Sequence, residues 1–456
     1  MRLTGEEIAA AMGAEVVAEG EPGSPKRATI ASGETGPGDL FFGLRGANRD
    51  GGEFAPAAIE AGAWGAVVGP EVRRTFSPDS GEKGRRTPWV FAVEDPLAAM
   101  QALARAWRRA LGARVVGVTG SVGKTSVKDI SRALLPGRVH ANRENLNTEI
   151  GLPLTILEAP EETDLLVLEM AMRGRGQIAE LAAIAEPEVA VITNVGPVHV
   201  ELLGSVEAIA AAKAEILDDL PPGGTAVAPV EAGELEPHLE PIAEVLRFGP
   251  GGDVEATEVR VAEGVTEAAI RTPLGEQTFH FPFAERHNLT NALAAVAAGV
   301  ALGADLAEMA DRAAGIGFSR FRGERLELPG GIVLVNDCYN ANPVSMRAAL
   351  DHLLTLEADR TVAVLGEMGE LGAGAAGYHR EVGEHARAAG VDFVIGVGLP
   401  ARDYGPDELV ADPGEAAELL AARLEPGDAV LVKGSRSAGL EAVAEQLPDL
   451  VAAEDG

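Results

Sequence analysis

The residues with the clearest chemical potential lie between positions 117 and 126, where a valine-rich run leads into a glycine-rich turn and then Lys-Thr-Ser. Glycines allow backbone N–H groups to close around phosphate oxygens, and a helix beginning near Lys124 adds its positive N-terminus. We expect Lys124 to reach the β- and γ-phosphates of a nucleotide and Thr125 to bind a magnesium ion. The expected phosphate cradle consists of Gly120, Ser121, Val122, Gly123, Lys124, Thr125 and Ser126.

The spacing of this segment departs from the common P-loop pattern. That pattern has glycine five positions before Gly123, but Val118 stands there, so the loop is a shortened Gly-x-x-Gly-Lys-Thr-Ser. A glycine-rich turn alone is often only a turn. The Lys-Thr pair after a valine-rich strand is what favours nucleotide binding here.

Three further candidates follow downstream. Glu169 comes directly after the apolar run 165–168, and a carboxylate at the end of a buried strand is unfavourable unless it binds a cation or hydrogen-bond donors. His199 lies shortly after the apolar run 189–192; a lone histidine there is more often structural, but its turn-rich surroundings favour the rim of the same site. Lys213 lies on a helix of small residues, where the simplest interpretation is a surface lysine.

Two polar segments near the C-terminus also follow apolar runs. Residues 336–343 combine two carboxamides with an acid and a phenol, which favours a ligand rim, although a structural turn is the alternative. Residues 433–437 offer two cations and backbone donors at the end of a strand. Such a cluster suits a carboxylate or a phosphate.

The elements that must position these residues form three α/β segments. The length of 456 residues favours about three domains, which we place at 1–88, 89–317 and 318–456. The first is a small α/β domain. In the second, alternating strands and helices predict a P-loop ATPase domain with a parallel sheet and a β insertion at 253–283. The third resembles a Rossmann-like doubly wound domain.

The composition argues against several classes of protein. Apolar residues make up 46% of the chain and charged residues 24%, and no apolar run approaches the roughly 18 residues needed to cross a bilayer. A net charge of −32 argues against a nucleic-acid partner. The single cysteine, Cys338, cannot form an internal disulfide, and the first residues lack the apolar core of a signal peptide. We therefore expect a cytoplasmic protein without membrane insertion.

Read together, these segments resemble the Mur ligase family, and within it the branch that adds D-alanyl-D-alanine to UDP-N-acetylmuramoyl-tripeptide. The resemblance rests on the shortened loop, on the stretches 145–155 and 366–372, on Glu169-Met170 and above all on Tyr-Asn-Ala-Asn-Pro at 339–343. It implies an ATP-dependent amide ligase of peptidoglycan precursor synthesis that works through an acyl phosphate. It also implies ATP and two Mg²⁺ ions as cofactors, small-molecule substrates as partners, and a monomer.

The family's functional residues can be placed on matching positions. The resemblance implies a first magnesium on Thr125 and Glu169, a second on His199, and Lys213 as a carbamate. Asn291 resembles the adenine-side residue of the family, and Arg325 and Asp337 resemble the residues that meet the γ-phosphate and the ribose. The implied catalytic residues are Lys124, Glu169, His199, Lys213 and Arg325. The implied substrate-binding residues are Ser32, Asn145, Asn147, Thr148, Tyr339, Asn340, Asn342, Lys433 and Ser435.

One part of the chain departs from the family. Where relatives have Asp-Ser-Arg or Asp-Thr-Arg before the Gly-Asp-Leu-Phe block, residues 31–34 read Ala-Ser-Gly-Glu, while the block itself at 38–41 is intact. We expect the UDP-binding fold with altered contacts. Two alternatives are a related ligase with a different carboxylate acceptor and a non-ligase P-loop NTPase. The polar segments at 339–343 and 433–437 argue against the second alternative.

Overall fold

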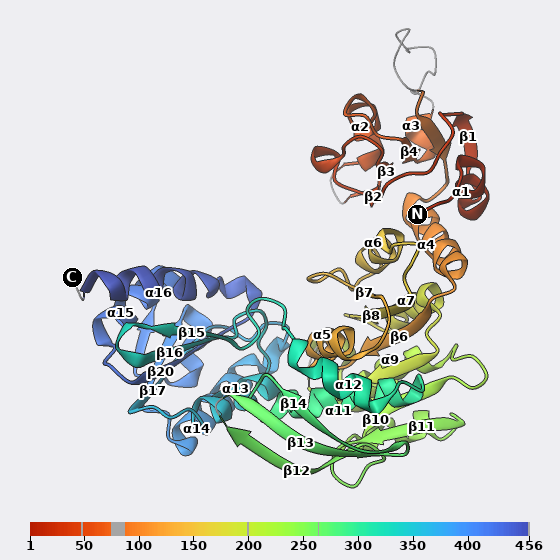
Figure 1. Cartoon of the computed structure of the whole chain (residues 1–456). Coiled ribbons are helices and arrows are strands. Elements are labelled where there is room, and N and C mark those ends of the chain that lie inside the picture. Colours follow the sequence, from red (N-terminus) through yellow and green to blue (C-terminus); the bar gives the residue numbers. More distant parts are fainter. Residues whose placement is uncertain (47–48, 74–86, 198–199, 263, 455–456) are drawn as a thin grey trace.

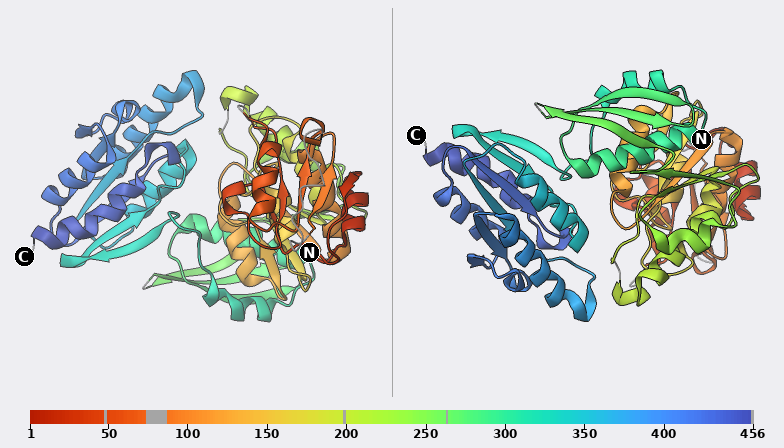
Figure 2. Two further views of the ribbon diagram at one scale, coloured as in Figure 1. Left: turned by 90° about the horizontal axis from the view of Figure 1, so that it is seen from above. Right: turned by 90° about the horizontal axis from the view of Figure 1, so that it is seen from below.

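The computed structural model describes residues 1–46, 49–73, 87–197, 200–262 and 264–454. Within these ranges the chain forms three α/β units in sequence order. The N-terminal unit sits on one end of the central unit, and the C-terminal unit lies beside the central one (Figure 1). The views from above and below show the C-terminal unit as a separate body joined to the central unit at one corner (Figure 2). No helix of the described residues is long and apolar enough to cross a membrane.

The N-terminal unit is built on a five-stranded sheet of order β1-β5-β4-β3-β2, in which β1 is antiparallel and the other strands are parallel. Its strands are β1 Glu15–Ala18, β2 Ala28–Thr29, β3 Leu40–Phe42, β4 Gly65–Val68 and β5 Trp89–Ala92. Its helices are α1 Gly5–Met12, α2 Ala55–Glu60 and α3 Pro70–Arg73. Because β5 completes this sheet, the N-terminal unit extends beyond the boundary predicted at residue 88.

The central unit contains a six-stranded parallel sheet of order β11-β10-β9-β6-β8-β7. Its strands are β6 Arg114–Thr119, β7 Val139–Ala141, β8 Leu165–Glu169, β9 Val189–Ile192, β10 Thr225–Pro229 and β11 Glu244–Phe248. Its helices are α4 Pro96–Leu111, α5 Lys124–Leu134, α6 Gly151–Glu158, α7 Gln177–Ala185, α8 Val200–Leu203, α9 Val206–Ala214, α10 Glu236–Leu239, α11 Arg286–Ala301 and α12 Leu306–Arg312. The predicted strands at 165–168 and 189–192 are confirmed.

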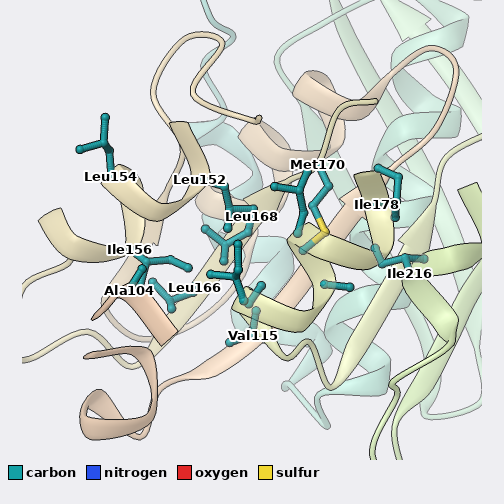
Figure 3. Packing of buried hydrophobic residues seen from close by; sticks show 14 of the residues in the cluster. Ala104, Val115, Leu152, Leu154, Ile156, Leu166, Leu168, Met170, Ile178 and Ile216 are labelled. Atoms are coloured by element: carbon teal, nitrogen blue, oxygen red, sulfur yellow. The ribbon is translucent and has the colours of Figure 1, made fainter. Parts of the chain in front are cut away.

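Strand β8 shows why this sheet needs helices on both faces. All five of its residues are buried, and successive side chains of a strand point to opposite faces. Leu166 and Leu168 join the core that contains α4, α6 and α7, where Figure 3 shows them beside Leu152 and Ile156. The intervening Leu165 and Val167 join the second core, under α5 and α11.

A three-stranded antiparallel sheet confirms the predicted β insertion. Its strands are β12 Glu255–Ala262, β13 Val265–Thr272 and β14 Gly275–Phe281, in that order. Phe279 and Phe281 lie two residues apart on one face and stack with ring centroids 5.5 Å apart, and Phe283 continues the stack at 5.2 Å. This aromatic row belongs to the same core as α5 and α11, so the insertion packs on the central unit.

The C-terminal unit is a doubly wound sheet of order β15-β16-β20-β17-β18-β19. Its strands are β15 Glu324–Leu328, β16 Ile332–Asn336, β17 Arg360–Leu365, β18 Phe393–Val397, β19 Glu408–Val410 and β20 Asp428–Lys433. Its helices are α13 Pro343–Leu353, α14 Ala375–Ala389, α15 Pro413–Arg423 and α16 Glu441–Glu454. Separate cores cover the two faces of the sheet. The antiparallel edge strand β15 was not predicted; three of its five residues are exposed, so it lacks the apolar run that marks the inner strands.

Candidate active site

The phosphate loop has the predicted strand–turn–helix form. Strand β6 ends at Thr119 and helix α5 begins at Lys124, with Gly123 at the N-cap in a left-handed conformation of φ +83°. A Cβ on Gly123 would lie 2.3 Å from Oδ1 of Asn291, so that position requires glycine for space as well as for conformation. Asn291, expected at the nucleotide, therefore lies directly against the loop.

The loop is held in place by the residues that follow β9. Asn194 Oδ1 accepts a hydrogen bond from the backbone N–H of Val122 at 2.8 Å, and Thr193 Oγ1 donates to the Val122 carbonyl at 2.5 Å. The hydroxyl of Ser121 donates to the carbonyl of Gly196 at 3.1 Å and accepts from its N–H at 3.0 Å. These bonds fix the backbone before any ligand binds, which lowers the cost of ordering it on binding.

Lys124 folds back over the loop that precedes it. Its Nζ donates to the carbonyl oxygen of Gly120 at 2.8 Å. Burial of the ammonium is the main cause that lowers the pKa of Lys124, and the positive charge of Arg322 lowers it further. A cation held at the mouth of a phosphate loop in this way is positioned to bind an anionic group such as a phosphate.

Thr125 and Glu169 meet at the carboxyl end of the sheet. Thr125 Oγ1 donates to Glu169 Oε2 at 2.8 Å, and Asn147 Nδ2 donates to Glu169 Oε1 at 2.8 Å. Glu169 is only 2% exposed. Thr125 Oγ1 and Glu169 Oε2 lie side by side, and a hard cation prefers such oxygen ligands. The described residues contain no cluster of three or more His, Cys, Asp or Glu side chains suited to a metal. A magnesium ion here would take its remaining ligands from phosphates and water, which is its usual preference.

Lys213 is buried and not on the surface, so the interpretation of it as a surface lysine is wrong. It is 2% exposed in α9. Burial lowers the pKa of Lys213 well below its ordinary value, and the charge of Lys124 lowers it further. Within the described ranges no carboxylate lies within ion-pair distance of its ammonium.

His199, the predicted second metal ligand, lies outside the described residues.

A cavity of about 1630 Å³ separates the central unit from the C-terminal unit. Most of the predicted site residues line it. From the central unit these are Ser121, Val122, Gly123, Lys124, Thr125, Ser126, Asn145, Asn147, Thr148, Glu169 and Asn291, and from the C-terminal unit they are Asp337, Tyr339, Asn340, Asn342, Lys433 and Ser435. The volume exceeds that of a drug-sized pocket, which is about 300–1,000 Å³, so the cavity has room for more than one substrate.

On the C-terminal side, Lys433 organises the loop that follows β16. Its Nζ donates to Asp337 Oδ2 at 2.6 Å and to the carbonyl of Asn340 at 3.0 Å, and the side chain is 2% exposed. Ser435 Oγ accepts from the N–H of Gly369 at 2.8 Å. The charge of Lys433 is thus balanced by Asp337, and the pair connects the ends of two neighbouring strands.

Two predicted residues need further description. Asn342 lines the cavity as predicted, and its Oδ1 also caps α13 by accepting from the N–H groups of Val344 at 3.1 Å and Ser345 at 2.9 Å. Arg325 was expected at the γ-phosphate, but it lies exposed on β15 and does not line the cavity; it pairs with Glu327 at 3.7 Å.

Arg322 is a cavity residue that sequence reasoning missed. It lies in the turn before β15 and lines the cavity, with its guanidinium carbon 4.2 Å from the ring centroid of Tyr339. Its Nε is buried without a hydrogen-bond partner. A signal existed in the alternation of arginine and phenylalanine at 319–322, Ser-Arg-Phe-Arg, because arginines beside aromatic rings are typical of ligand sites.

Ser32 lies apart from this cavity, at the start of a short 3₁₀ turn in the N-terminal unit. That loop is held by Arg27, whose Nη2 donates to the carbonyl of Glu34 at 2.8 Å and whose guanidinium pairs with Asp39 at 3.1 Å. Asp39 also accepts from the N–H of Gly36 at 2.9 Å. The pairing of Arg27 with Asp39 was not predicted. It holds the loop at residues 31–34, where this chain lacks the charged residues expected from the family.

The linker between the central and C-terminal units is fastened to the phosphate helix. Ser319 donates to Asp129 Oδ2 from its N–H at 2.9 Å and from its hydroxyl at 2.7 Å. The other oxygen of Asp129 pairs with the buried Lys128 at 2.9 Å. Helix α5, which begins at Lys124, therefore also holds the linker between the two units. The contact between Ser319 and Asp129 is called the joint below.

The fold and cavity define an ATP-dependent ligase: a phosphate loop with a buried carboxylate faces a polar loop of a second α/β unit across a cavity with room for more than one substrate. The Mur ligase middle domain matches residues 118–299, and the Mur ligase glutamate ligase domain matches residues 321–436. The chain is 39% identical to the UDP-N-acetylmuramoyl-tripeptide–D-alanyl-D-alanine ligase of Synechocystis over 90% of this chain and 89% of that protein. The chain belongs to the Mur ligase family.

Solved structures agree with this assignment. A crystal structure of MurF from Acinetobacter baumannii superposes with a TM-score of 0.88 at 28% identity, covering 98% of this chain and 99% of the other. The MurF ligase of Thermotoga maritima in complex with ADP has a TM-score of 0.80 at 30% identity, with 94% of this chain and 98% of the other covered. The three-unit α/β architecture is therefore that of the MurF structures.

Proposed function

We propose that this protein joins D-alanyl-D-alanine to UDP-N-acetylmuramoyl-tripeptide, with conversion of ATP to ADP and phosphate, in the cytoplasmic synthesis of peptidoglycan precursors. The observation that carries the proposal is the cavity itself, in which the phosphate loop at Lys124 faces the loop of Tyr339 and Asn340. The relatives named for this reaction match over nine-tenths of the chain, which supports the choice of substrates.

The reaction begins when the terminal carboxylate of the tripeptide attacks the γ-phosphorus of ATP. The bond to the β,γ-bridging oxygen breaks, ADP leaves, and an acyl phosphate remains. Lys124 offsets part of the negative charge that gathers as carboxylate and phosphates approach. The amine of D-alanyl-D-alanine then attacks the activated carbonyl, and the bond to phosphate breaks. The cavity has room for both acceptor and donor, so the amine can lie next to the acyl phosphate when it forms.

Magnesium fits the oxygens of Thr125 and Glu169. When bound there it would neutralise charge on the β- and γ-phosphates. Asn147, which donates to Glu169, holds the carboxylate in one orientation, so the site is ordered in advance. A second magnesium near His199 is part of the same proposal.

Lys213 is proposed to act as a carbamate. A neutral amine attacks CO₂, an N–C bond forms and a proton is released, so that a buried ammonium becomes an anion. Two features support this proposal: the side chain is 2% exposed, and burial lowers the pKa of Lys213 well below its ordinary value, which favours the neutral amine that the reaction needs. An anion beside Lys124 would replace the repulsion between two cations by an attraction.

The uridine nucleotide is proposed to bind at the N-terminal unit, near Ser32. Ala31 and Gly33 stand where relatives carry charged residues, so contacts to the nucleotide depend more on backbone groups of the loop that Arg27 holds. A ligase with a different carboxylate acceptor is the second candidate, favoured by this same replacement. The protein is proposed to work as a monomer.

The test is ADP release from the purified protein with ATP, Mg²⁺, UDP-N-acetylmuramoyl-tripeptide and D-alanyl-D-alanine, with each substrate omitted in turn. We expect full turnover only with the complete mixture, and the pentapeptide product by mass spectrometry. Undiminished ADP release without either substrate would refute the ligase assignment. Turnover with another carboxylate in place of the tripeptide would favour the second candidate.

A further inference from the structure

Asn142 is a buried asparagine that is not among the residues lining the cavity, yet it holds the backbone of Glu169. Its Oδ1 accepts a hydrogen bond from the Glu169 N–H at 2.6 Å. Its Nδ2 donates to the Glu169 carbonyl at 3.4 Å and to the Leu146 carbonyl at 2.5 Å. Both the acceptor and the donor group of this amide are therefore used in holding backbone atoms.

The side chain of Asn142 continues the pairing of β7 with β8 beyond the end of β7. The backbone pairing of these two strands ends with Ala141 opposite Val167, two residues before Glu169. On its other side, β8 stays paired with β6 as far as Glu169. The amide of Asn142 thus supplies partners to the backbone of Glu169 after β7 has ended, and buried backbone groups need such partners.

Asn142 also holds the loop that orients the carboxylate of Glu169. Leu146, which accepts from Asn142, directly precedes Asn147 in the chain. Asn147 donates to Glu169 Oε1, and Thr125 donates to Oε2, each at 2.8 Å. The hydrogen bonds of Asn142 go to backbone atoms, so its effect on the carboxylate is indirect.

Lys128 supports Asn142 from the phosphate-loop helix α5. Its Nζ donates to the carbonyl oxygen of Asn142 at 3.0 Å and pairs with Asp129 Oδ1 at 2.9 Å, and both residues of this ion pair are buried. A buried ion pair contributes little net stability compared with apolar side chains of similar volume. Its effect is therefore better sought in the atoms that it holds, and one of these is the carbonyl of Asn142.

We propose that Asn142, supported by Lys128, is a positioning residue for the carboxylate of Glu169. This proposal rests on the magnesium site of the ligase function proposed above. Removal of a residue that holds a metal ligand in place typically lowers metal affinity by about 10- to 100-fold. Because Asn142 does not line the cavity, its loss should weaken binding of the ion and leave binding of metal-free ADP nearly unchanged.

The experiment measures binding of Mn²⁺, which prefers the same oxygen ligands as Mg²⁺, to the protein saturated with ADP. Bound Mn²⁺ is determined from the loss of the free-ion signal in electron paramagnetic resonance. Asn142→Ala is compared with the matched control Thr155→Ala, because Thr155 is also buried in the central unit and its Oγ1 donates to the backbone carbonyl of Gly151 at 3.0 Å. ADP affinity in EDTA, the Mg²⁺ dependence of kcat for ligation and the thermal unfolding midpoint are measured alongside.

We expect Asn142→Ala to weaken Mn²⁺ binding by about 10- to 100-fold while ADP affinity in EDTA changes by less than about 3-fold. At saturating Mg²⁺ its kcat should return close to normal, since the metal ligands themselves are unchanged. Thr155→Ala should bind Mn²⁺ normally. Asn142→Ser keeps a hydroxyl that can donate and accept, so it perturbs the fold less and should weaken Mn²⁺ binding less than the alanine variant.

A double variant, Lys128→Met/Asp129→Asn, tests the support from α5. It removes both charges together, so no buried charge is left unpaired, and it should weaken Mn²⁺ binding by about 3- to 10-fold. Unchanged Mn²⁺ affinity in this variant would overturn the part assigned to Lys128.

The role of Asn142 is overturned if Mn²⁺ affinity stays within about 3-fold of normal in Asn142→Ala or, should that variant not fold, is unchanged in Asn142→Ser. An equal loss in Thr155→Ala would overturn it as well. Glu169→Gln serves as the reference for the site itself. If this variant binds Mn²⁺ as the unmodified protein does, the magnesium site of the proposed function fails together with the role of Asn142.

Discussion

Substitution of Gly123 by alanine tests whether the phosphate loop depends on its exact backbone and on the neighbouring Asn291. The positive φ of +83° costs an L-residue about 1–2 kcal/mol. The new Cβ would lie 2.3 Å from Asn291 Oδ1, which is too close, so Asn291 must rotate. That rotation breaks its hydrogen bond to Asn288 Oδ1 at 3.2 Å, worth about 1 kcal/mol. The sum is about 2–3 kcal/mol.

The loop can relieve this strain by leaving its phosphate-binding conformation, so the penalty should appear in nucleotide affinity. A penalty of about 2–3 kcal/mol corresponds to ADP binding weakened by about 30- to 160-fold. The assay is titration calorimetry with ADP and Mg²⁺. Because the double variant Gly123→Ala/Asn291→Ala removes the steric overlap but keeps the backbone strain, it separates the two causes.

In the Asn291→Ala background, Gly123→Ala should weaken ADP binding by only about 5- to 30-fold, since only the strain at φ remains. The coupling between the two sites is thus expected near 1 kcal/mol. Equal losses in both backgrounds would refute the steric part of the reasoning, and unchanged affinity in Gly123→Ala alone would refute all of it. Thermal unfolding of each variant checks that the fold is retained.

Three other outcomes are expected. Lys124→Ala should abolish ADP formation without unfolding the protein, because Lys124 supplies the cation folded over the loop; substantial retained activity would exclude its phosphate role. Lys213→Ala should lose most activity and regain part of it with formate or acetate in place of the carbamate, whereas full activity without rescue would exclude the carbamate. Burial raises the pKa of the Cys338 thiol from 9.0 to about 12, so between these two pH values the folded state binds up to one proton more than the unfolded state. The free energy of unfolding should therefore fall by about 1.4 kcal/mol per pH unit more steeply than in Cys338→Ala, and identical slopes in urea titrations would contradict this.

The local parts of the site were predictable from the sequence because they depend on neighbouring residues. The turn from strand to helix at Lys124 follows from glycines between an apolar run and an amphipathic stretch. Glu169 was predicted at the end of a strand because parallel strands place their carboxyl ends together. Asn342 also carried a local signal: Asn followed by Pro and by Ser at the third helical position marks an N-cap, and this signal was overlooked.

The remaining parts depend on contacts between segments far apart in the chain. The burial of Lys213 follows from how α9 packs against α7 and α8 in the central unit, and an alanine-rich helix gives no clear polar or apolar face. The choice between Arg322 and Arg325 depends on the register of β15 against β16. A shift of one residue in that pairing would turn Arg325 to the other face of the sheet, whereas Arg322 lies in the turn before the strand, and sequence spacing alone determines neither position.

The attachment of Ser319 to Asp129 determines which atoms move when the angle between the central and C-terminal units changes. Rotation about a fixed point displaces each atom in proportion to its distance from that point. Arg322 is three residues from Ser319, and three residues span at most about 11 Å, so it stays near α5 at every angle. Atoms farther from the joint travel further. A change in that angle would therefore widen the far side of the cavity more than the side next to the Ser319–Asp129 contact.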